Sequence, residues 1–212
     1  IKGDKTDYST ILVGDNGERV ILVARGQSRL EKKNFPFSKL PSSRWVYLSS
    51  LEGNISLLEK IIFWAKERGS KIALNPGSRE LKEKRRLKTL LPLLAVLIVN
   101  EEEASVFWGR NWRRAIKRSP AEIIVVTLGK KGACLAAEGR LIEETIFKTK
   151  TVDATGAGDA FSVGLIAGLS WGKNLKESLR LAMITSGLAV SNLGAKTGLP
   201  TKKQLLKLAE NV

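Results

Sequence analysis

A short run of small residues that ends in a carboxylate, Gly156-Ala157-Gly158-Asp159, offers the clearest chemistry in the chain. Small and apolar residues follow it in a pattern that predicts a helix over 158–169. The first backbone N–H groups of a helix lack carbonyl partners, and the helix dipole adds roughly half a positive charge there. The run therefore predicts an anion site with Asp159 beside it. This pairing suits phosphoryl transfer, in which a carboxylate orients the attacking hydroxyl.

Other chemistries are excluded by composition and by motif tests. The sequence has no histidine and one cysteine, Cys134, so it cannot build a Ser-His-Asp triad, a Cys-His pair, a Cys or His zinc site or an internal disulfide. A Walker A pattern is absent. The dinucleotide fingerprint fails because bulky Phe161 stands where a small residue is needed. Cys134 lies in an apolar run and is interpreted as a core residue. A bare Gly-x-Gly-Asp is also compatible with a plain turn before a buried helix.

The charge balance favours acidic partners. The chain has 36 Lys and Arg against 21 Asp and Glu, a formal net charge of +15. The densest basic segment, 110–118, contains no acid, and its Trp112 and Ile116 are four residues apart. That spacing predicts an amphipathic helix with a solvated basic face. A non-enzymatic nucleic-acid-binding protein is therefore kept as a rival function, although aromatic residues are few and no nucleic-acid motif is present.

The elements that must position the loop alternate between short apolar runs and longer amphipathic segments. Strands are predicted at 45–48, 71–74, 96–99, 123–127 and 133–136. Helices are predicted at 55–68, 79–91, 102–108, 120–122, 158–169 and 175–192. This alternation predicts an α/β fold with a doubly wound, mostly parallel sheet and helices on both faces. In such folds ligands bind beyond the carboxyl ends of the strands.

The N-terminal part has a different pattern. Residues 6–13 and 18–23 are strand-like and flank the turn sequence Asp15-Asn16-Gly17, which predicts a β-hairpin. We expect two domains, with residues 1–33 a hairpin and linker and residues 34–212 the α/β domain. No uncharged run reaches about 18 residues and no signal-peptide pattern opens the chain, so we expect a cytoplasmic protein. The first residue is Ile1 and the single methionine is Met183, which favours a processed chain or a piece of a longer one.

The loop also belongs to a longer string that resembles the C-terminal signature of the ribokinase-like family of carbohydrate kinases. Further segments resemble family motifs in family order, and together they extend over nearly the whole chain. They are Leu74-Asn75-Pro76-Gly77, Asn100-Glu101-Glu102-Glu103-Ala104, Thr127-Leu128-Gly129-Lys130-Lys131-Gly132, Asp153-Ala154-Thr155-Gly156-Ala157-Gly158-Asp159-Ala160-Phe161, and Gly194-Ala195-Lys196 before Pro200.

The resemblance implies a transferase that moves the γ-phosphoryl group of ATP to a sugar hydroxyl. Asp159 would be the general base that also contacts the substrate, and the N–H groups of Gly156, Ala157 and Gly158 would hold the charge on the transferring group. A nucleoside kinase of the same family is the alternative. Glu52 aligns with an acid that contacts sugar hydroxyls in the family, and it also reads as an ordinary charge near a helix N-terminus.

The resemblance also implies nucleotide and magnesium contacts. Asn100, Thr127, Gly129, Gly132 and Gly158 would bind ATP. Glu103 would organise water around Mg²⁺, a hard cation that keeps its waters. From spacing alone, Asn100 and Glu103 form a capping box, and 127–132 could be a plain hairpin turn.

A potassium site is a further expectation from the resemblance. Its ligands would be Asp153 and the carbonyls of Thr155, Ala189, Asn192 and Gly194. Gly198 stands where the family usually has a serine, and Thr197 is the candidate substitute. Met183 stands where some members have an asparagine near adenine.

The family has an additional N-terminal segment that carries the first sheet strands and sugar-binding motifs, and this sequence lacks it. The hairpin would then be a remnant of a small β lid with exposed edges. We expect low activity from the chain alone. A homodimer or a separate N-terminal segment would be its partner, beside a small sugar and ATP and with no membrane.

Overall fold

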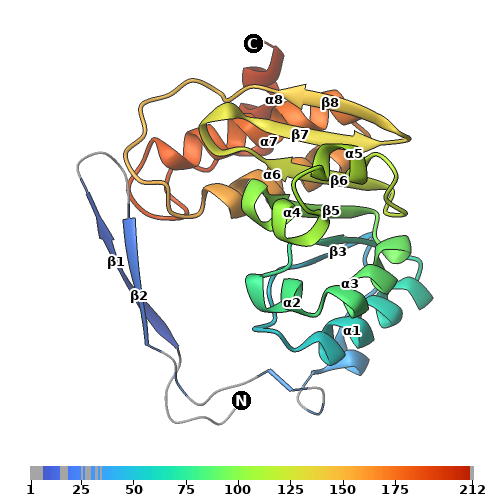
Figure 1. Cartoon of the computed structure of the whole chain (residues 1–212). Helices are drawn as coiled ribbons and strands as arrows, with labels where there is room; N and C mark the ends of the chain where they lie inside the picture. Colours follow the sequence, from blue (N-terminus) through green and yellow to red (C-terminus); the bar gives the residue numbers. More distant parts are fainter. Residues whose placement is uncertain are drawn as a thin grey trace. The chain divides into compact units, whose positions relative to one another are not determined.

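The computed structural model describes residues 7–14, 19–24, 26, 30–31, 33 and 35–210. It divides into two compact units. The first comprises Ile1–Phe35 with Ile146–Val212, and the second comprises Pro36–Thr145 (Figure 1). The boundary that the sequence placed between residues 33 and 34 lies two residues from this division. The C-terminal segment 146–212 groups with the first unit, and this second break was not predicted.

The second unit is built on a six-stranded sheet whose strands follow one another in chain order (Figure 1). The first four strands are parallel and the last two pairings are antiparallel. The strands are β3 (Trp45–Leu48), β4 (Lys71–Leu74), β5 (Val96–Asn100), β6 (Ile123–Thr127), β7 (Ala133–Ala137) and β8 (Arg140–Glu144). The mostly parallel sheet confirms the predicted fold class. Strand β8 was not predicted.

Helices link the parallel strands. They are α1 (Ile55–Glu67), α2 (Ser78–Lys82), α3 (Lys84–Leu90), α4 (Glu101–Trp108) and α5 (Trp112–Ile116), with 3₁₀ turns η2 (Phe37–Lys39), η3 (Leu91–Leu93) and η4 (Gly129–Lys131). The single helix predicted over 79–91 is wrong, because the chain breaks at Glu83, which has ψ of 43°. The helix predicted at 120–122 is also wrong, because three residues cannot close a helical turn and these form bends.

The apolar residues of the strands and of the inward helix faces form the core of this unit. Strand residues 96–99 and 124–126 are all buried, as expected for strands covered on both faces. On α1 the buried residues Leu57, Leu58, Ile61 and Ile62 recur at helical spacing. On α5 both Trp112 and Ile116 are buried, which confirms the amphipathic helix predicted there.

Where the structure describes it, the first unit contains three helices, α6 (Ala157–Ser170), α7 (Leu175–Val190) and α8 (Lys202–Glu210). Helices α6 and α7 pack closely because Gly164 and Gly168 have no side chains. A Cβ on Gly164 would lie 2.6 Å from Thr185 Oγ1, and one on Gly168 would lie 2.9 Å from Ser178 Cα. The two glycines are one helical turn apart and therefore let the two backbones approach.

The predicted hairpin is also present in this unit. Strands β1 (Tyr8–Val13) and β2 (Arg19–Ala24) are antiparallel, with Tyr8 opposite Ala24. The predicted turn Asp15-Asn16-Gly17 lies outside the described residues. Apolar side chains remain exposed along both strands, among them Tyr8 (67%), Leu12, Val20 and Leu22. A two-stranded sheet cannot bury its own faces, so this exposure follows from its size.

Candidate active site

The Gly-rich loop turns sharply into α6 at Gly156. Gly156 is the N-cap residue and has φ of +78°, a left-handed conformation that glycine adopts without strain. A Cβ there would also lie 2.9 Å from the Cβ and carbonyl oxygen of Ala195. The loop thus packs against the 194–198 segment, and a residue with a side chain at 156 would push the two apart.

The start of α6 leaves hydrogen-bond donors unused. Among the described residues, no protein group accepts from the N–H of Gly156, Gly158 or Asp159, whereas Ala157 N donates to Ala154 O at 3.3 Å. Gly158 is exposed, and a Cβ built on it would meet no atom within 4 Å. The amides of Gly156 and Gly158 are therefore available to an anion, and there is space above Gly158 for one.

Asp159 is exposed at the third position of α6, and no ion pair or side-chain hydrogen bond holds its carboxylate within the described part of the chain. A side chain serving only as a helix cap would bond to backbone amides of the first turn. This carboxylate remains available to an incoming hydroxyl.

A second carboxylate, Asp153, holds the Gly-rich loop through hydrogen bonds to backbone amides. It is 3% exposed, and its Oδ1 accepts from Thr155 N at 2.8 Å while its Oδ2 accepts from Gly194 N at 3.0 Å. The amides of Val152 and Asp153 both donate to Val190 O, at 2.8 and 3.2 Å, which ties the loop to the end of α7. Ser186 Oγ on α7 donates to Ala157 O at 3.0 Å. The beginning of α6 is therefore held by α7 and by the segment after it.

Of the residues expected to bind potassium, Thr155 and Gly194 contact Asp153 through their amides. Thr155 Oγ1 is buried and has no hydrogen-bond partner among the described residues. The carbonyl of Ala189 already accepts from the amides of Ser191 and Asn192. At Gly198, φ is +83° and a Cβ would lie 2.2 Å from Asn192 Nδ2. The Asn192 amide thus occupies the space a serine would need at 198.

In the second unit, polar residues gather at the carboxyl ends of the parallel strands. Asn75, after β4, donates from its amide N–H to Leu48 O at 2.8 Å and from Nδ2 to Ile98 O at 2.9 Å. It thereby links β3 and β5, the strands on either side of β4. Asn100 and Thr127 end β5 and β6 and are register partners. The structure therefore brings these two predicted nucleotide contacts side by side.

Asn100 and Glu103 form the capping box that their spacing indicated. Asn100 Oδ1 accepts from Glu103 N, and Glu103 Oε2 accepts from Asn100 N, both at 2.8 Å. Burial raises the pKa of the Glu103 carboxyl, the Asn100 N–H lowers it and neighbouring Glu102 raises it, so that it lies above its usual value. Among the described residues, the side-chain Nδ2 of Asn100 and Oε1 of Glu103 have no partner and are available for a ligand.

The segment after β6 is a tight connection to β7. Leu128 N donates to Gly132 O at 2.8 Å, and η4 fills the turn. Gly129 has φ of +57° and Gly132 has φ of +100°, and a Cβ on Gly132 would lie 2.0 Å from Glu144 O. Sequence spacing had allowed a plain hairpin turn here, and the backbone does form one, with Gly129 exposed.

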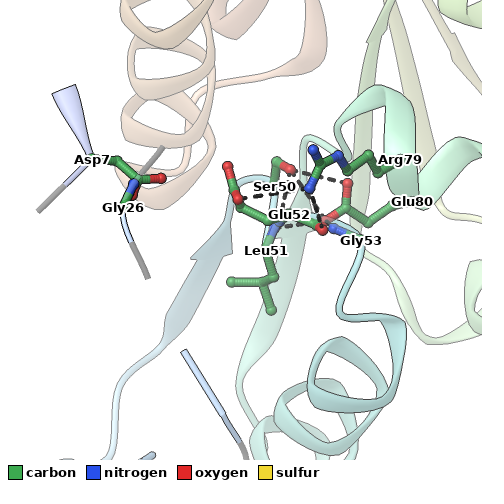
Figure 2. A network of polar contacts seen from close by, with 8 residues as sticks. All are labelled: Asp7, Gly26, Ser50, Leu51, Glu52, Gly53, Arg79 and Glu80. Carbon is green, nitrogen blue, oxygen red and sulfur yellow. Dashed lines mark hydrogen bonds and ion pairs between the residues drawn. The ribbon is translucent and has the colours of Figure 1, made fainter. Parts of the chain in front are cut away.

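Sequence reasoning missed Glu80, which organises the loop after β3. Its side chain is fully buried, and Figure 2 shows hydrogen bonds converging on it from Ser50, Leu51 and Gly53. Oε1 accepts from Leu51 N at 2.7 Å and from Gly53 N at 2.9 Å, and Oε2 accepts from Gly77 N at 3.0 Å. Ser50 Oγ donates to both oxygens, at 3.1 and 3.0 Å.

These donors determine the direction in which the pKa of Glu80 is shifted. Burial raises the pKa of this carboxyl, but the N–H groups of Gly53 and Leu51 and the Ser50 hydroxyl outweigh burial and leave the pKa below its usual value. The one sequence signal was its position three residues after Gly77, the spacing of a capping box. That signal identifies the bond to Gly77 but not the bonds to Ser50, Leu51 and Gly53.

Glu52 lies on the loop that Glu80 holds. It is exposed and has φ of +59°, which costs a residue other than glycine about 1–2 kcal/mol. Arg79 Nη1 donates to Glu52 O at 3.4 Å and lies 3.8 Å from Glu52 Oε2 (Figure 2). The predicted substrate residue is thus presented to solvent on a strained turn.

The basic segment 110–118 is explained by the fold. Arg113 pairs with Glu143 and lies over the Trp112 ring at 4.7 Å. The remaining basic side chains of the segment are mostly exposed around buried Trp112 and Ile116. Cys134 is buried in β7, and burial raises the pKa of its thiol, so it is the core residue that the sequence predicted.

The described residues contain no group of three or more Cys, Asp or Glu side chains arranged to hold a metal ion. No helix among them is both long and apolar enough to cross a membrane.

Comparison with known proteins gives a consistent result. The family described as pfkB family carbohydrate kinase matches residues 1–202. The ribokinase of Haemophilus influenzae is 26% identical over the whole chain, which covers 71% of that protein. The first curated relatives are matched over 45–71% of their own length.

Solved structures give the same fold. Arabidopsis thaliana ribokinase, solved with ribose and ATP, has a TM-score of 0.76 at 23% identity over 97% of this chain and 69% of its own. Adenosine kinase from Sinorhizobium meliloti has a TM-score of 0.80 at 18% identity over 99% of this chain and 67% of its own. At these identities the similarity shows the fold alone, and the two solved structures are a ribokinase and an adenosine kinase.

Proposed function

The chain belongs to the pfkB family of carbohydrate kinases, and from that premise we propose that it transfers the γ-phosphoryl group of ATP to a hydroxyl of a sugar. One observation carries the proposal. Among the described residues, the exposed Asp159 carboxylate in the first turn of α6 has no protein partner, and the N–H of the preceding Gly158 has no protein acceptor and faces open space.

Each part of this loop has a role in the transfer. The acceptor oxygen forms a bond to the γ-phosphorus, the bond from phosphorus to the bridging oxygen of ADP breaks, and Asp159 receives the hydroxyl proton. The N–H groups of Gly156 and Gly158 stabilise the charge on the transferring group. Because Ala157 N already donates to Ala154 O, its contribution is the smallest of the three amides.

The nucleotide contacts are assigned to the strand ends of the second unit. Asn100, Thr127, Gly129 and Gly132 would bind ATP; the register of Asn100 with Thr127 and the exposure of Gly129 support this assignment. Bound Mg²⁺ would neutralise charge on the phosphate oxygens. Glu103 fits its water shell, because Oε2 is used by Asn100 N and Oε1 remains available.

A potassium ion fits the loop around Asp153 in part. A buried carboxylate and the buried Thr155 hydroxyl, which has no partner, are groups that a cation would satisfy. Asp153 and the carbonyls of Thr155, Asn192 and Gly194 would hold it. Ala189 is the weakest of the assigned ligands because its carbonyl already has two donors.

The test is an ADP-release assay on the purified chain with Mg²⁺-ATP and a panel of acceptors: ribose, fructose, myo-inositol and adenosine. We expect acceptor-dependent ADP release that Asp159→Asn abolishes and that the matched acid variant Glu177→Gln on α7 retains. Release with adenosine in preference to every sugar would favour a nucleoside kinase. If no acceptor stimulates ADP release, the proposed function is wrong.

A further inference from the structure

Glu80 is buried and ionised although it lies in a short helix that needs only one cap. Its carboxylate is fully buried and accepts from three backbone amides and one hydroxyl. Within the described residues no Lys or Arg forms an ion pair with it. A charge buried among neutral donors is costly to maintain. The bond from Gly77 alone would cap the helix, so the bonds from the 50–53 turn indicate a second role for Glu80.

The second task concerns the turn at residues 50–53. Leu51 and Gly53 flank Glu52 in the chain, and both donate to the same oxygen, Glu80 Oε1. The amide of Glu52 itself donates to Ser50 Oγ at 3.2 Å, and that hydroxyl donates to Glu80. Three successive amides are therefore fixed on one carboxylate, directly or through Ser50 (Figure 2).

The turn holds Glu52 in a conformation that it would not adopt alone. Glu52 has φ of +59° and Gly53 has φ of +83°. Gly53 also lies close to Arg79, since a Cβ on it would be 2.9 Å from Arg79 Cβ. A left-handed conformation at a residue other than glycine persists only where its surroundings impose it, and such strain is concentrated at binding sites.

The result is an acidic side chain presented at the carboxyl end of β3. Glu52 is exposed, with 57% of its side chain accessible, and the Arg79 guanidinium lies 3.8 Å from its Oε2. In α/β sheets this edge is where ligands bind. A carboxylate on a fixed backbone can accept hydrogen bonds from adjacent hydroxyls of a polyol at a lower entropy cost than one on a mobile loop.

We propose that Glu80 is a positioning residue for the acceptor site: it locks the 50–53 turn so that the Glu52 carboxylate meets the hydroxyls of the acceptor. The inference rests on the proposed function for the identity of the acceptor. Glu80 itself does not contact the substrate.

A double-mutant cycle tests this. Glu80→Gln keeps the shape but replaces an accepting oxygen with an N–H₂ group that faces the donors of the turn. We expect the KM for the acceptor to rise about tenfold, with the KM for ATP changed less than about twofold. Glu52→Ala should raise the acceptor KM by a similar factor, and the double variant should add no more than about twofold, because both changes disable one device.

The matched control is Glu59→Gln on α1. Glu59 also binds its partner through both oxygens, here Arg86, and it lies outside the 50–53 turn. We expect it to lower stability without changing the acceptor KM. Ser50→Ala is a milder second variant in case Glu80→Gln folds poorly, and it should shift the acceptor KM in the same direction by a smaller factor. Amide hydrogen exchange at residues 51–53 should be faster in both turn variants.

The outcomes separate the two proposals. Independent, multiplicative effects of Glu80→Gln and Glu52→Ala, or unchanged exchange at residues 51–53, would overturn the positioning role. If the wild-type chain transfers no phosphate yet binds an acceptor in calorimetry, and Glu80→Gln weakens that binding, the proposed reaction fails and the positioning role stands. If the wild-type chain binds no acceptor from the panel, both the proposed reaction and the positioning role of Glu80 are wrong.

Discussion

Two loops of this protein use the same backbone device in opposite ways. The 156–159 loop and the 50–53 turn each precede a helix, each contain a left-handed residue, and each carry amides that no regular secondary structure uses. In the 50–53 turn the chain supplies its own anion, because the Glu80 carboxylate accepts hydrogen bonds from the amides of Leu51 and Gly53. At 156–159 no group in the described part of the chain accepts from the amides of Gly156 or Gly158.

The contrast separates amides that hold a turn from amides that are open to an anion. Donors that converge on a buried carboxylate hold the backbone in place, and those amides are not available to a ligand. Donors without an acceptor, next to open space and an exposed carboxylate, constitute a site that a bound anion would complete. Four experiments test this contrast, and the variant with the greatest predicted loss of activity comes first.

The first is Asp159→Asn. Because an amide cannot take up the hydroxyl proton, kcat should fall by about 10²–10⁴-fold while ATP affinity is unchanged. Steady-state kinetics with ATP titration measures both. Glu177→Gln should keep wild-type kcat, and a kcat for Asp159→Asn within threefold of wild type would contradict the role of the open loop.

The second is a pair of glycine variants in the open loop. Gly156→Ala places a Cβ 2.9 Å from Ala195 at a φ of +78° and should cost about 1–3 kcal/mol of unfolding free energy. Gly158→Ala meets nothing within 4 Å and should leave stability unchanged or slightly higher, yet weaken ATP binding because the methyl group enters the open space. Thermal unfolding measures the stability of both variants, and nucleotide titration measures ATP binding by Gly158→Ala. Equal destabilisation by both variants would mean that the space above Gly158 is filled.

The third concerns the filled turn. The pKa of Glu80 is lowered from 4.5, so its stabilising contribution is present above about pH 4.5 and is lost as pH falls through the lower, folded-state value. Glu80→Gln should therefore cost about 1–3 kcal/mol at neutral pH, and the gap from wild type should narrow in acid. Denaturant unfolding between pH 3 and 7 checks this. A gap that does not change with pH would show that the charge of Glu80 is not what holds the turn.

The fourth concerns Glu103, whose pKa is shifted in the opposite direction. It is raised from 4.5, so the favourable contribution is present at low pH and is lost as pH rises through the raised value. A glutamine can keep the cap by accepting from Asn100 N. Glu103→Gln should therefore match or exceed wild-type stability at neutral pH by less than about 0.5 kcal/mol, with no difference in strong acid. A clear loss of stability at neutral pH would mean that the ionised carboxylate, and not its shape, makes the cap.

Much of the fold follows from local pattern. The strands predicted at 45–48, 71–74 and 123–127 have the observed bounds, because short and mostly apolar runs of this length are typical of strands in a covered parallel sheet. Strand β8 escaped prediction because three of its five residues, Arg140, Glu143 and Glu144, are charged. Its position comes from antiparallel pairing with β7.

The candidate site divides in the same way. Local sequence was sufficient to predict a carboxylate after a Gly-rich turn at a helix start, the cap that Asn100 and Glu103 form, and a hairpin before the α/β part. Each of these depends on residues within a few positions of one another. Which amides stay open and which donate to Glu80 follows from the folded structure alone. The donors to Glu80 at Leu51 and Gly53 lie 29 and 27 residues away, and a hydrogen bond across that distance leaves no periodic trace in the chain.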